Sequence, residues 1–184
     1  KVPFARKNLT EHNQICDKPV LVVGNGPSLD DLEDFLRENQ QKFIIISCGT
    51  AISSLLKKGI QPDIHIEQER DKMVRDVLLS TTTEDIRKEL FCIGLNPCYP
   101  QTLALFDHNY MVLKLKDSGV ELLKQVGMKG LYELQNCNPL VSNFGLSVAV
   151  MLGFNNIYIA GVDCGMVDLK KHHSKDSFYY TNKF

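Results

Sequence analysis

The sequence predicts an α/β domain built on a mainly parallel, doubly wound sheet. Short apolar runs of strand length alternate along the chain with longer amphipathic segments, which is the rhythm of β-α-β units. The strand-like runs are almost continuously apolar, as expected for strands that helices cover on both faces. With 184 residues, 43% of them hydrophobic, the chain is long enough to bury one core.

Six segments have the composition of strands. Branched apolar side chains dominate them, and glycines stop the first segment at Gly24 and the last at Gly161. The third segment differs because its apolar and polar residues alternate. The expected strands are residues 19–23, 43–47, 63–67, 90–94, 110–113 and 156–160.

Helices are expected between these strands. Ser28 is a typical N-cap residue, and the apolar residues over 29–36 keep a spacing near that of an α-helix. A second helix is predicted over 50–58, ended by Gly59. A polar helical region without clear ends fills the seventies and eighties, and a last helix is predicted over 143–152.

Composition excludes several classes of protein. The net charge is −1, so nothing in the overall charge attracts nucleic acid or anionic lipid, and no apolar run approaches membrane-spanning length. We expect one domain over residues 1–184, with 1–17 as a lead-in, cut from a longer protein because Lys1 is not a methionine. The cysteines form no C-x-x-C pair, which predicts reduced thiols in a cytoplasmic protein. They lie at positions 16, 48, 92, 98, 137 and 164.

A glycine-containing loop after the first expected strand is the strongest candidate for a binding site. Glycines let backbone N–H groups approach an anion, and the start of a helix favours a phosphate there. The loop matches neither the dinucleotide-binding fingerprint nor the P-loop. Its glycines and the helix that follows nevertheless predict that it binds the phosphate of a nucleotide. The alternative is a tight turn that binds nothing. The loop consists of Gly24, Asn25, Gly26, Pro27 and Ser28.

Other candidates lie beyond the carboxyl ends of the strands, where parallel sheets bind ligands. Glu67 ends the third expected strand on that edge. Asp163 follows the last strand, where its carboxylate can hold a ribose hydroxyl, a metal or an amino group, or simply bond a neighbouring loop. His172 and His173 stand in the polar segment after it. A histidine there can exchange a proton near neutral pH, or be part of a solvated loop without chemistry.

Three of these features resemble, in the same order, the bacterial sialyltransferases that act on lipooligosaccharide. They are Gly-Asn-Gly-Pro-Ser-Leu at 24–29, the helix-strand unit over 142–163, and His-Ser-Lys at 173–175. The resemblance implies that Asn25 contacts a CMP-sugar donor and that His173 is the general base. It also implies that the donor is held by the turn at Ser142 and Asn143.

The sequence departs from that family at several positions. The family has an asparagine after its second strand, where this chain has Cys48, Gly49 and Thr50, so Gly49 and Thr50 become the donor contacts expected there. A further family asparagine falls on Glu67 by spacing or on Asn96 by local similarity, and both stay candidates. The family's phosphate-binding tyrosines correspond to residues 164–166, which contain none.

The glycine loop, residues 59–63 and the block ending at Asp163 resemble the motility accessory factor proteins even more closely. These are flagellin glycosyltransferases whose central domain also resembles archaeal hydroxymethylpterin diphosphokinases. The resemblance spans roughly residues 18–180. It implies a Rossmann-like, sialyltransferase-like fold.

Three functions follow as hypotheses. The resemblance implies a glycosyltransferase that passes a nonulosonic acid from its CMP form to a protein or glycan hydroxyl, with flagellin Ser or Thr as one acceptor. No cofactor or metal is then expected, because CMP carries a single phosphate. The second hypothesis is a 6-hydroxymethylpterin diphosphokinase, which needs ATP and Mg²⁺ held by Asp163 with Glu67 or Glu69. The third is a binding module without catalysis.

Overall fold

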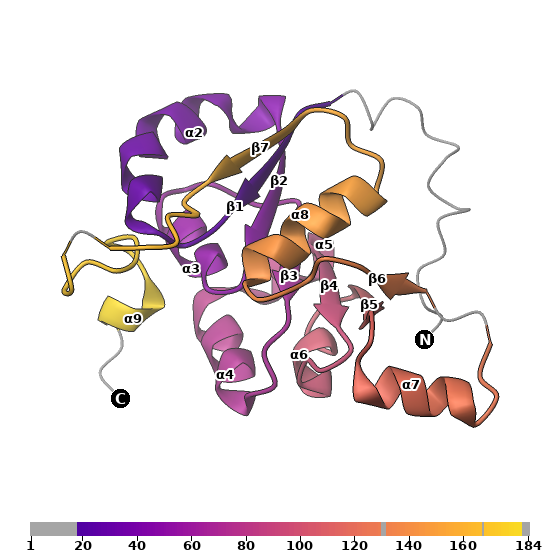
Figure 1. Cartoon of the computed structure of the whole chain (residues 1–184). Helices are drawn as coiled ribbons and strands as arrows, with labels where there is room; N and C mark the ends of the chain where they lie inside the picture. The colour runs from indigo at the N-terminus through magenta and orange to yellow at the C-terminus, as the bar shows by residue number, and fades with distance from the viewer. Residues whose placement is uncertain (1–17, 130–131, 167, 182–184) are drawn as a thin grey trace.

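The structure, a computed structural model, describes residues 18–129, 132–166 and 168–181. Its centre is a sheet of seven strands in the order β6-β5-β4-β3-β2-β1-β7 (Figure 1). Every neighbouring pair is parallel. The strands are β1 Val20–Val23, β2 Ile44–Cys48, β3 Ile64–Glu67, β4 Phe91–Leu95, β5 His108–Lys114, β6 Glu133–Leu134 and β7 Ile157–Ala160. The predicted parallel α/β sheet is therefore confirmed.

Helices connect the strands and flank the sheet (Figure 1). They are the 3₁₀ helices η2 Pro27–Leu32 and η3 Gln40–Lys42, and the α-helices α2 Glu33–Asn39, α3 Ala51–Lys57, α4 Lys72–Thr81, α5 Glu84–Glu89, α6 Pro100–Leu103, α7 Ser118–Gln125, α8 Val141–Met151 and α9 Phe178–Thr181. The prediction of Ser28 as an N-cap is wrong. Gly26 occupies the cap of η2, because Pro27 with its fixed φ already starts the helix.

Alternate residues of β1 point to opposite faces of the sheet and enter different cores. Val20 and Val22 pack in one cluster with Phe144 and Val148 of α8. Leu21 and Val23 pack in another, whose remaining members come mainly from η2, α2, β2 and α3 and include Leu29, Leu36, Ile45 and Leu55. Both faces of β1 are thus covered, which confirms the doubly wound arrangement.

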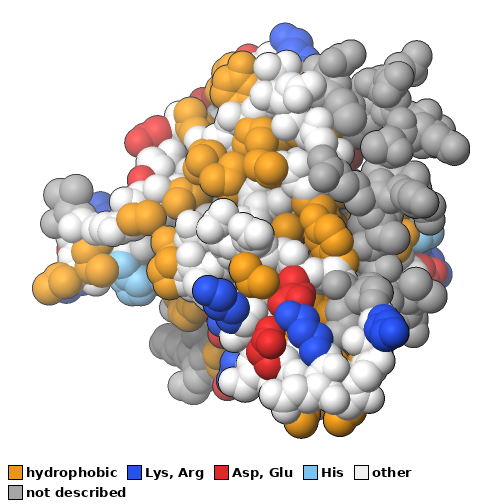
Figure 2. All heavy atoms as spheres, turned by 45° about the vertical axis from the view of Figure 1, so that its right-hand side comes forward, with side chains coloured by type: hydrophobic (Ala, Val, Ile, Leu, Met, Phe, Trp, Pro, Cys, Tyr) orange, Lys and Arg blue, Asp and Glu red, His pale blue; other side chains and the backbone are white. Residues whose placement is uncertain are grey.

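The far edge of the sheet leaves apolar side chains exposed. Tyr158 and Ile159 of β7 are 56% and 55% exposed, and Val150 of α8 is 60% exposed. Figure 2 shows hydrophobic side chains gathered on one face of the molecule. Tyr158 and Ile159 are successive residues of a strand and so point to opposite faces of the sheet, and exposed apolar side chains of this kind are ordinary on a protein surface.

Candidate functional site

A cavity lies beyond the carboxyl end of β1, where the order of the strands along the chain reverses. The chain runs from β1 through β2 to β6 on one side, and β7 returns to the other side. Such a reversal of strand order is where open α/β sheets bind ligands, beyond the carboxyl ends of the strands. A cavity of about 640 Å³ opens there, bounded by the loops after β1, β2, β3 and β7, by α4, and by the segment before and including α9.

Most of the residues singled out from the sequence line this cavity together. Those that line it are Gly24, Asn25, Gly26, Gly49, Thr50, Glu67, Ser142, Asp163 and His173. Those outside its lining are Pro27, Ser28, Asn96 and Asn143. The fold therefore gathers residues that are separated by up to about 150 positions in the sequence.

Two glycines at the cavity floor are required by the contact between β1 and β7. A Cβ atom on Gly24 would lie 2.5 Å from the carbonyl oxygen of Gly161, and one on Gly161 would lie 2.4 Å from that of Gly24. Gly161 also has a φ of +63°, which favours glycine. These glycines serve the close approach of two strand ends, whether or not an anion binds.

The N–H groups of the glycine loop are largely engaged by the protein. Gly24 donates to Ala160 O at 2.8 Å, and Gly26 donates to Gly161 O at 2.7 Å. Ser28 N–H donates to the Asp163 carboxylate at 3.2 Å. Among the described residues, the Asn25 N–H has no acceptor. An incoming phosphate would thus find the Asn25 N–H free and the Ser28 N–H only after Asp163 moves.

The carboxylate of Asp163 lies directly over Gly26. A Cβ atom built on Gly26 would fall 1.9 Å from Asp163 Oδ2. The side chain is exposed, so this carboxylate sits where a negatively charged ligand would approach the loop. Of the readings left open by the sequence, the structure shows the bond to a neighbouring loop; binding of a ligand stays a prediction.

The side chain of Asn25 is buried and fully engaged. Its Nδ2 donates to Thr50 Oγ1 at 2.9 Å and to Ser177 Oγ at 2.8 Å, while Oδ1 accepts from Ser54 Oγ at 2.6 Å. Its carbonyl oxygen accepts from Ser174 N–H at 2.9 Å. The residue expected to contact a donor therefore fastens the C-terminal segment to the loop after β1. Of the polar groups of Asn25, only the backbone N–H is left to contact a ligand directly.

Two other predicted contacts have structural partners away from the cavity. Asn96 accepts from Lys114 N–H at 2.8 Å and donates to Asp117 at 3.1 Å, which ties the end of β4 to β5 and the start of α7. Asn143 accepts from Leu140 N–H at 3.1 Å at the start of α8. Of the two alternatives for the second family asparagine, only Glu67 lines the cavity.

Glu67 belongs to a buried group of polar side chains that the sequence did not predict. Its Oε1 accepts from Gln68 and Glu69 N–H at 2.8 and 2.9 Å, and its Oε2 lies 3.7 Å from Nε2 of the buried His65. Ser47 Oγ lies 3.1 Å from the other ring nitrogen, His65 Nδ1. His65 and Glu67 are two apart in β3, so their side chains share a face of the sheet. The two-residue spacing of His65 and Glu67 in a predicted strand was the sequence signal that could have revealed this contact.

His173 stands at the cavity wall on the segment between β7 and α9. Its ring packs on Tyr179 with centroids 4.5 Å apart and meets His172 edge-on at 4.6 Å. Its Nδ1 is buried and has no hydrogen-bond partner among the described residues. Burial, and after it the charge of His172, lower the pKa of His173. The ring is therefore held in the neutral form that accepts a proton.

The charged groups around the cavity are mostly acidic. Glu67, Glu69, Asp71 and Asp163 line it, and no lysine or arginine does so among the described residues. A nucleotide would thus meet the negative charge of these carboxylates. Within that same part of the chain, no group of three or more His, Cys, Asp or Glu residues has the arrangement of a metal site.

The opposite wall of the cavity is apolar and was not anticipated. It is formed by Met73, Val74, Val77 and Leu78 of α4 with Phe178 of α9. The sequence predicts only a polar helical region here, because the apolar residues of α4 are spaced among charged and polar ones. The cavity therefore pairs a polar floor at the strand ends with an apolar side.

The cysteines have little part in this chemistry. Cys48, Cys92, Cys98 and Cys137 are buried free thiols, and Cys164 is an exposed one. Burial raises the pKa of the Cys98 thiol to about 12 and that of Cys137 to about 11. Such thiols stay protonated and pack as small apolar groups. Cys16 lies outside the described residues.

Comparison with known proteins places the chain in a family. The model of the family described as 6-hydroxymethylpterin diphosphokinase MptE-like matches residues 3–168. The chain belongs to this family. A search of curated proteins gave no match.

A solved structure supports the same relationship. The structure of a MAf glycosyltransferase from Magnetospirillum magneticum AMB-1 matches this chain with a TM-score of 0.73 and 28% sequence identity. The match covers 92% of this chain and 29% of that protein, so the MptE-like chain spans less than a third of its relative's length. The resemblance to the central domain of motility accessory factor proteins is confirmed. No helix in the described part of the chain is long and apolar enough to cross a membrane.

Proposed function

We propose that this MptE-like chain is the donor-binding and catalytic domain of a glycosyltransferase. The observation that carries the proposal is that one cavity joins the loop at Gly24–Gly26 to the neutral ring of His173. Similarity to a MAf glycosyltransferase over 92% of the chain supports the same class of reaction. The donor is a nucleotide-activated sugar, and the acceptor is a hydroxyl group.

The residues around the cavity suit the two halves of a sugar transfer. The bond from the sugar to the phosphate breaks, and the developing negative charge on the phosphate needs hydrogen-bond donors. The Asn25 N–H is available for that role, joined by Ser28 N–H when Asp163 turns away. His173 removes the proton from the acceptor hydroxyl as the new bond to the sugar forms.

The finer proposal concerns the two substrates. The donor is a CMP-linked nonulosonic acid, and the acceptor is a protein or glycan hydroxyl, with flagellin Ser or Thr as the leading case. The resemblance of residues 24–29 and 173–175 to CMP-sugar enzymes supports this choice. Because CMP has one phosphate, transfer proceeds without a metal, in the cytoplasm where nucleotide sugars are made.

A second candidate function has an observation of its own. Four carboxylates and no lysine or arginine line the cavity among the described residues, so a polyphosphate would need a cation between it and the protein. That chemistry fits Mg²⁺-ATP and a 6-hydroxymethylpterin diphosphokinase, the activity that the family description contains. Glu67, Glu69 and Asp163 are the carboxylates nearest the strand ends.

Calorimetric titration separates the two candidates. The purified protein is titrated with CMP, ATP and GDP, each with and without Mg²⁺. The transferase proposal expects CMP to bind equally in both conditions, whereas the kinase expects ATP to bind only with Mg²⁺. Failure of every nucleotide to bind would overturn both and leave a binding module.

A turnover assay then tests the role of His173. His173→Gln is compared with wild type for CMP release from a CMP-nonulosonic acid in the presence of acceptor. We expect CMP binding to be retained and turnover to fall about 100-fold or more, the usual contribution of a general base. His108→Gln, remote from the cavity and stacked on Phe91, is the control. Equal turnover in the two variants would contradict the assignment.

A further inference from the structure

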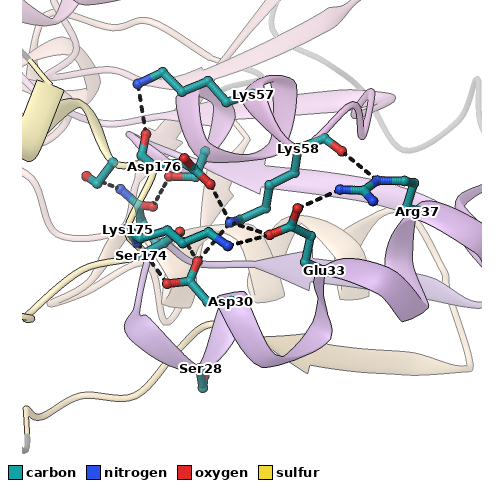
Figure 3. Close-up of polar contacts among 12 residues, drawn as sticks. Ser28, Asp30, Glu33, Arg37, Lys57, Lys58, Ser174, Lys175 and Asp176 are labelled. Carbon is teal, nitrogen blue, oxygen red and sulfur yellow. Dashed lines mark hydrogen bonds and ion pairs between the residues drawn. The ribbon is translucent and has the colours of Figure 1, made fainter.

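A buried ammonium group ties together three parts of the chain around the candidate base. The side chain of Lys58, which follows α3, has no exposed area. Its Nζ lies 2.8 Å from Asp30 of η2, 3.2 Å from Glu33 of α2 and 2.6 Å from Asp176 of the C-terminal segment (Figure 3). These three carboxylates converge on one nitrogen.

The two residues that follow His173 bind the same cluster. Ser174 Oγ donates to Asp30 at 2.5 Å, and Lys175 N–H donates to the other oxygen of Asp30 at 2.8 Å. The ammonium of Lys175 lies 2.9 Å from Glu33. The backbone next to His173 is thus fixed by Asp30, and Asp30 is fixed by Lys58 (Figure 3).

The charge on Lys58 is kept although it is buried. Burial alone would lower the pKa of Lys58, but hydrogen bonds to Asp176, Asp30 and Glu33 outweigh it and raise the pKa. For Asp30, burial alone would raise the pKa, and the bonds from Lys58, Ser174 and Lys175 lower it instead. Lys58 and Asp30 therefore stay charged near neutral pH, and directional charged contacts set the position of the segment.

We infer that Lys58 is a positioning residue for the transfer reaction: it holds His173 at the cavity wall through Asp30 and Asp176. Lys58 does not line the cavity and so touches no substrate. The part of this inference that concerns turnover rests on the proposed function. The part that concerns the placement of His173 does not.

Four variants test the inference, and the mildest of them, Asp176→Asn, is expected to fold. Asp176→Asn weakens the contact from the segment and leaves Lys58 its two other carboxylates. Lys58→Gln removes the centre of the cluster, and Asp176→Glu restores a carboxylate on the segment. Lys88→Gln is the matched control, because Lys88 forms an exposed pair with Glu84 on α5.

Two measurements are made on each folded variant. NMR titration follows the His173 ring, assigned by comparison with His173→Gln, and steady-state kinetics give kcat and the donor KM. In Asp176→Asn and Lys58→Gln we expect the titration midpoint to rise towards that of an unburied histidine. We expect kcat to fall by roughly 10- to 100-fold, as for a misplaced catalytic group, while the donor KM stays within about twofold. Asp176→Glu and Lys88→Gln should stay near wild type.

The outcomes are distinguishable. If the midpoint and kcat of folded Asp176→Asn and Lys58→Gln match those of Lys88→Gln, the inference is overturned. If the wild-type protein transfers no sugar, the proposed function fails, and the NMR titration alone decides whether Lys58 places His173. A fall in kcat with an unmoved titration midpoint would also count against the inference, because the ring would not have changed its surroundings.

Discussion

The side-chain amide of Asn25 donates a 2.8 Å hydrogen bond to the hydroxyl of Ser177, which lies 152 residues further along the chain. This bond joins the loop after β1 to the segment that carries His173. The same amide also donates to Thr50, the N-cap of α3, and accepts from Ser54 within that helix. The same side chain, Asn25, would therefore hold in place both the loop that binds a nucleotide and the segment that carries the candidate base.

Asn25→Ala tests the strength of that support. The change removes three side-chain hydrogen bonds and takes away the acceptor of the buried Ser54 hydroxyl, so we expect the free energy of unfolding to fall by about 2–4 kcal/mol. Urea unfolding followed by circular dichroism measures it. Asn39→Ala is the control, because that amide bonds Phe35 O at an exposed position. Equal losses in the two variants would show that the network contributes no stability of its own.

His172→Gln tests the electrostatic environment of the candidate base. His173 must be neutral to accept a proton, so kcat/KM should decline as pH falls through its lowered pKa. Replacing His172 removes a positive neighbour, which raises the pKa of His173 and moves this acid limb to higher pH. The pH profile of kcat/KM, with His108→Gln as control, gives the shift. An unmoved or downward-shifted limb would mean that His172 does not act on His173.

The strands were predictable because their signal is local. Continuous apolar runs such as residues 20–23 are required wherever a parallel strand is covered on both faces. β6 was missed because two residues, Glu133 and Leu134, carry no periodic pattern. α7 was not predicted either, although Asp117 caps it by accepting from Gly119 and Val120 N–H.

The location of the site was predictable, whereas the partners of its residues were not. Position after a strand and the topology of α/β sheets are enough to place Gly24, Thr50, Glu67 and Asp163 at one edge. The bonds of Asn25 to Ser54 and Ser177 span 29 and 152 residues, and no local pattern encodes them. Lys58 looks like an ordinary helix-end lysine until the fold brings Asp30 and Asp176 to it.

Acid should remove the stability that the Lys58 cluster contributes to the fold. Hydrogen bonds from Lys175 and Lys58 lower the pKa of Glu33 to about 2, and that of Asp30 is also lowered. A carboxyl group with a lowered pKa stabilises the fold above its unfolded pKa, and this contribution is lost as pH falls through the folded one. The window therefore runs from about pH 4.5 down to about pH 2.

The urea midpoint measured from pH 7 to pH 2 tests this window. Wild type should lose stability most steeply below about pH 4.5, where the unfolded chain takes up protons on Glu33 and Asp30 that the folded protein does not yet bind. Glu33→Gln should start from a lower midpoint at pH 7 and then show a shallower decline. Glu84→Gln is the control: Lys88 lowers the pKa of Glu84 as well, but the pair is exposed, so this variant should change the slope less than Glu33→Gln does. If Glu33→Gln shows the same slope as wild type, the cluster is not the main cause of the loss of stability in acid.

Asp163→Asn distinguishes a carboxylate that competes with a ligand from one that holds it. Oδ2 accepts from Ser28 N–H at 3.2 Å, in the place where a phosphate would approach the loop. The amide keeps an oxygen acceptor for a ribose hydroxyl but removes the negative charge. Repulsion between two charges at about 4 Å in a water-exposed site amounts to ~1 kcal/mol, so CMP should bind roughly fivefold more tightly to Asp163→Asn. Cytidine without a phosphate should bind both proteins equally in the same calorimeter. The opposite result would be weaker binding of both CMP and cytidine to Asp163→Asn. It would mean that the charged carboxylate itself holds the ribose and that the phosphate does not reach the Ser28 N–H.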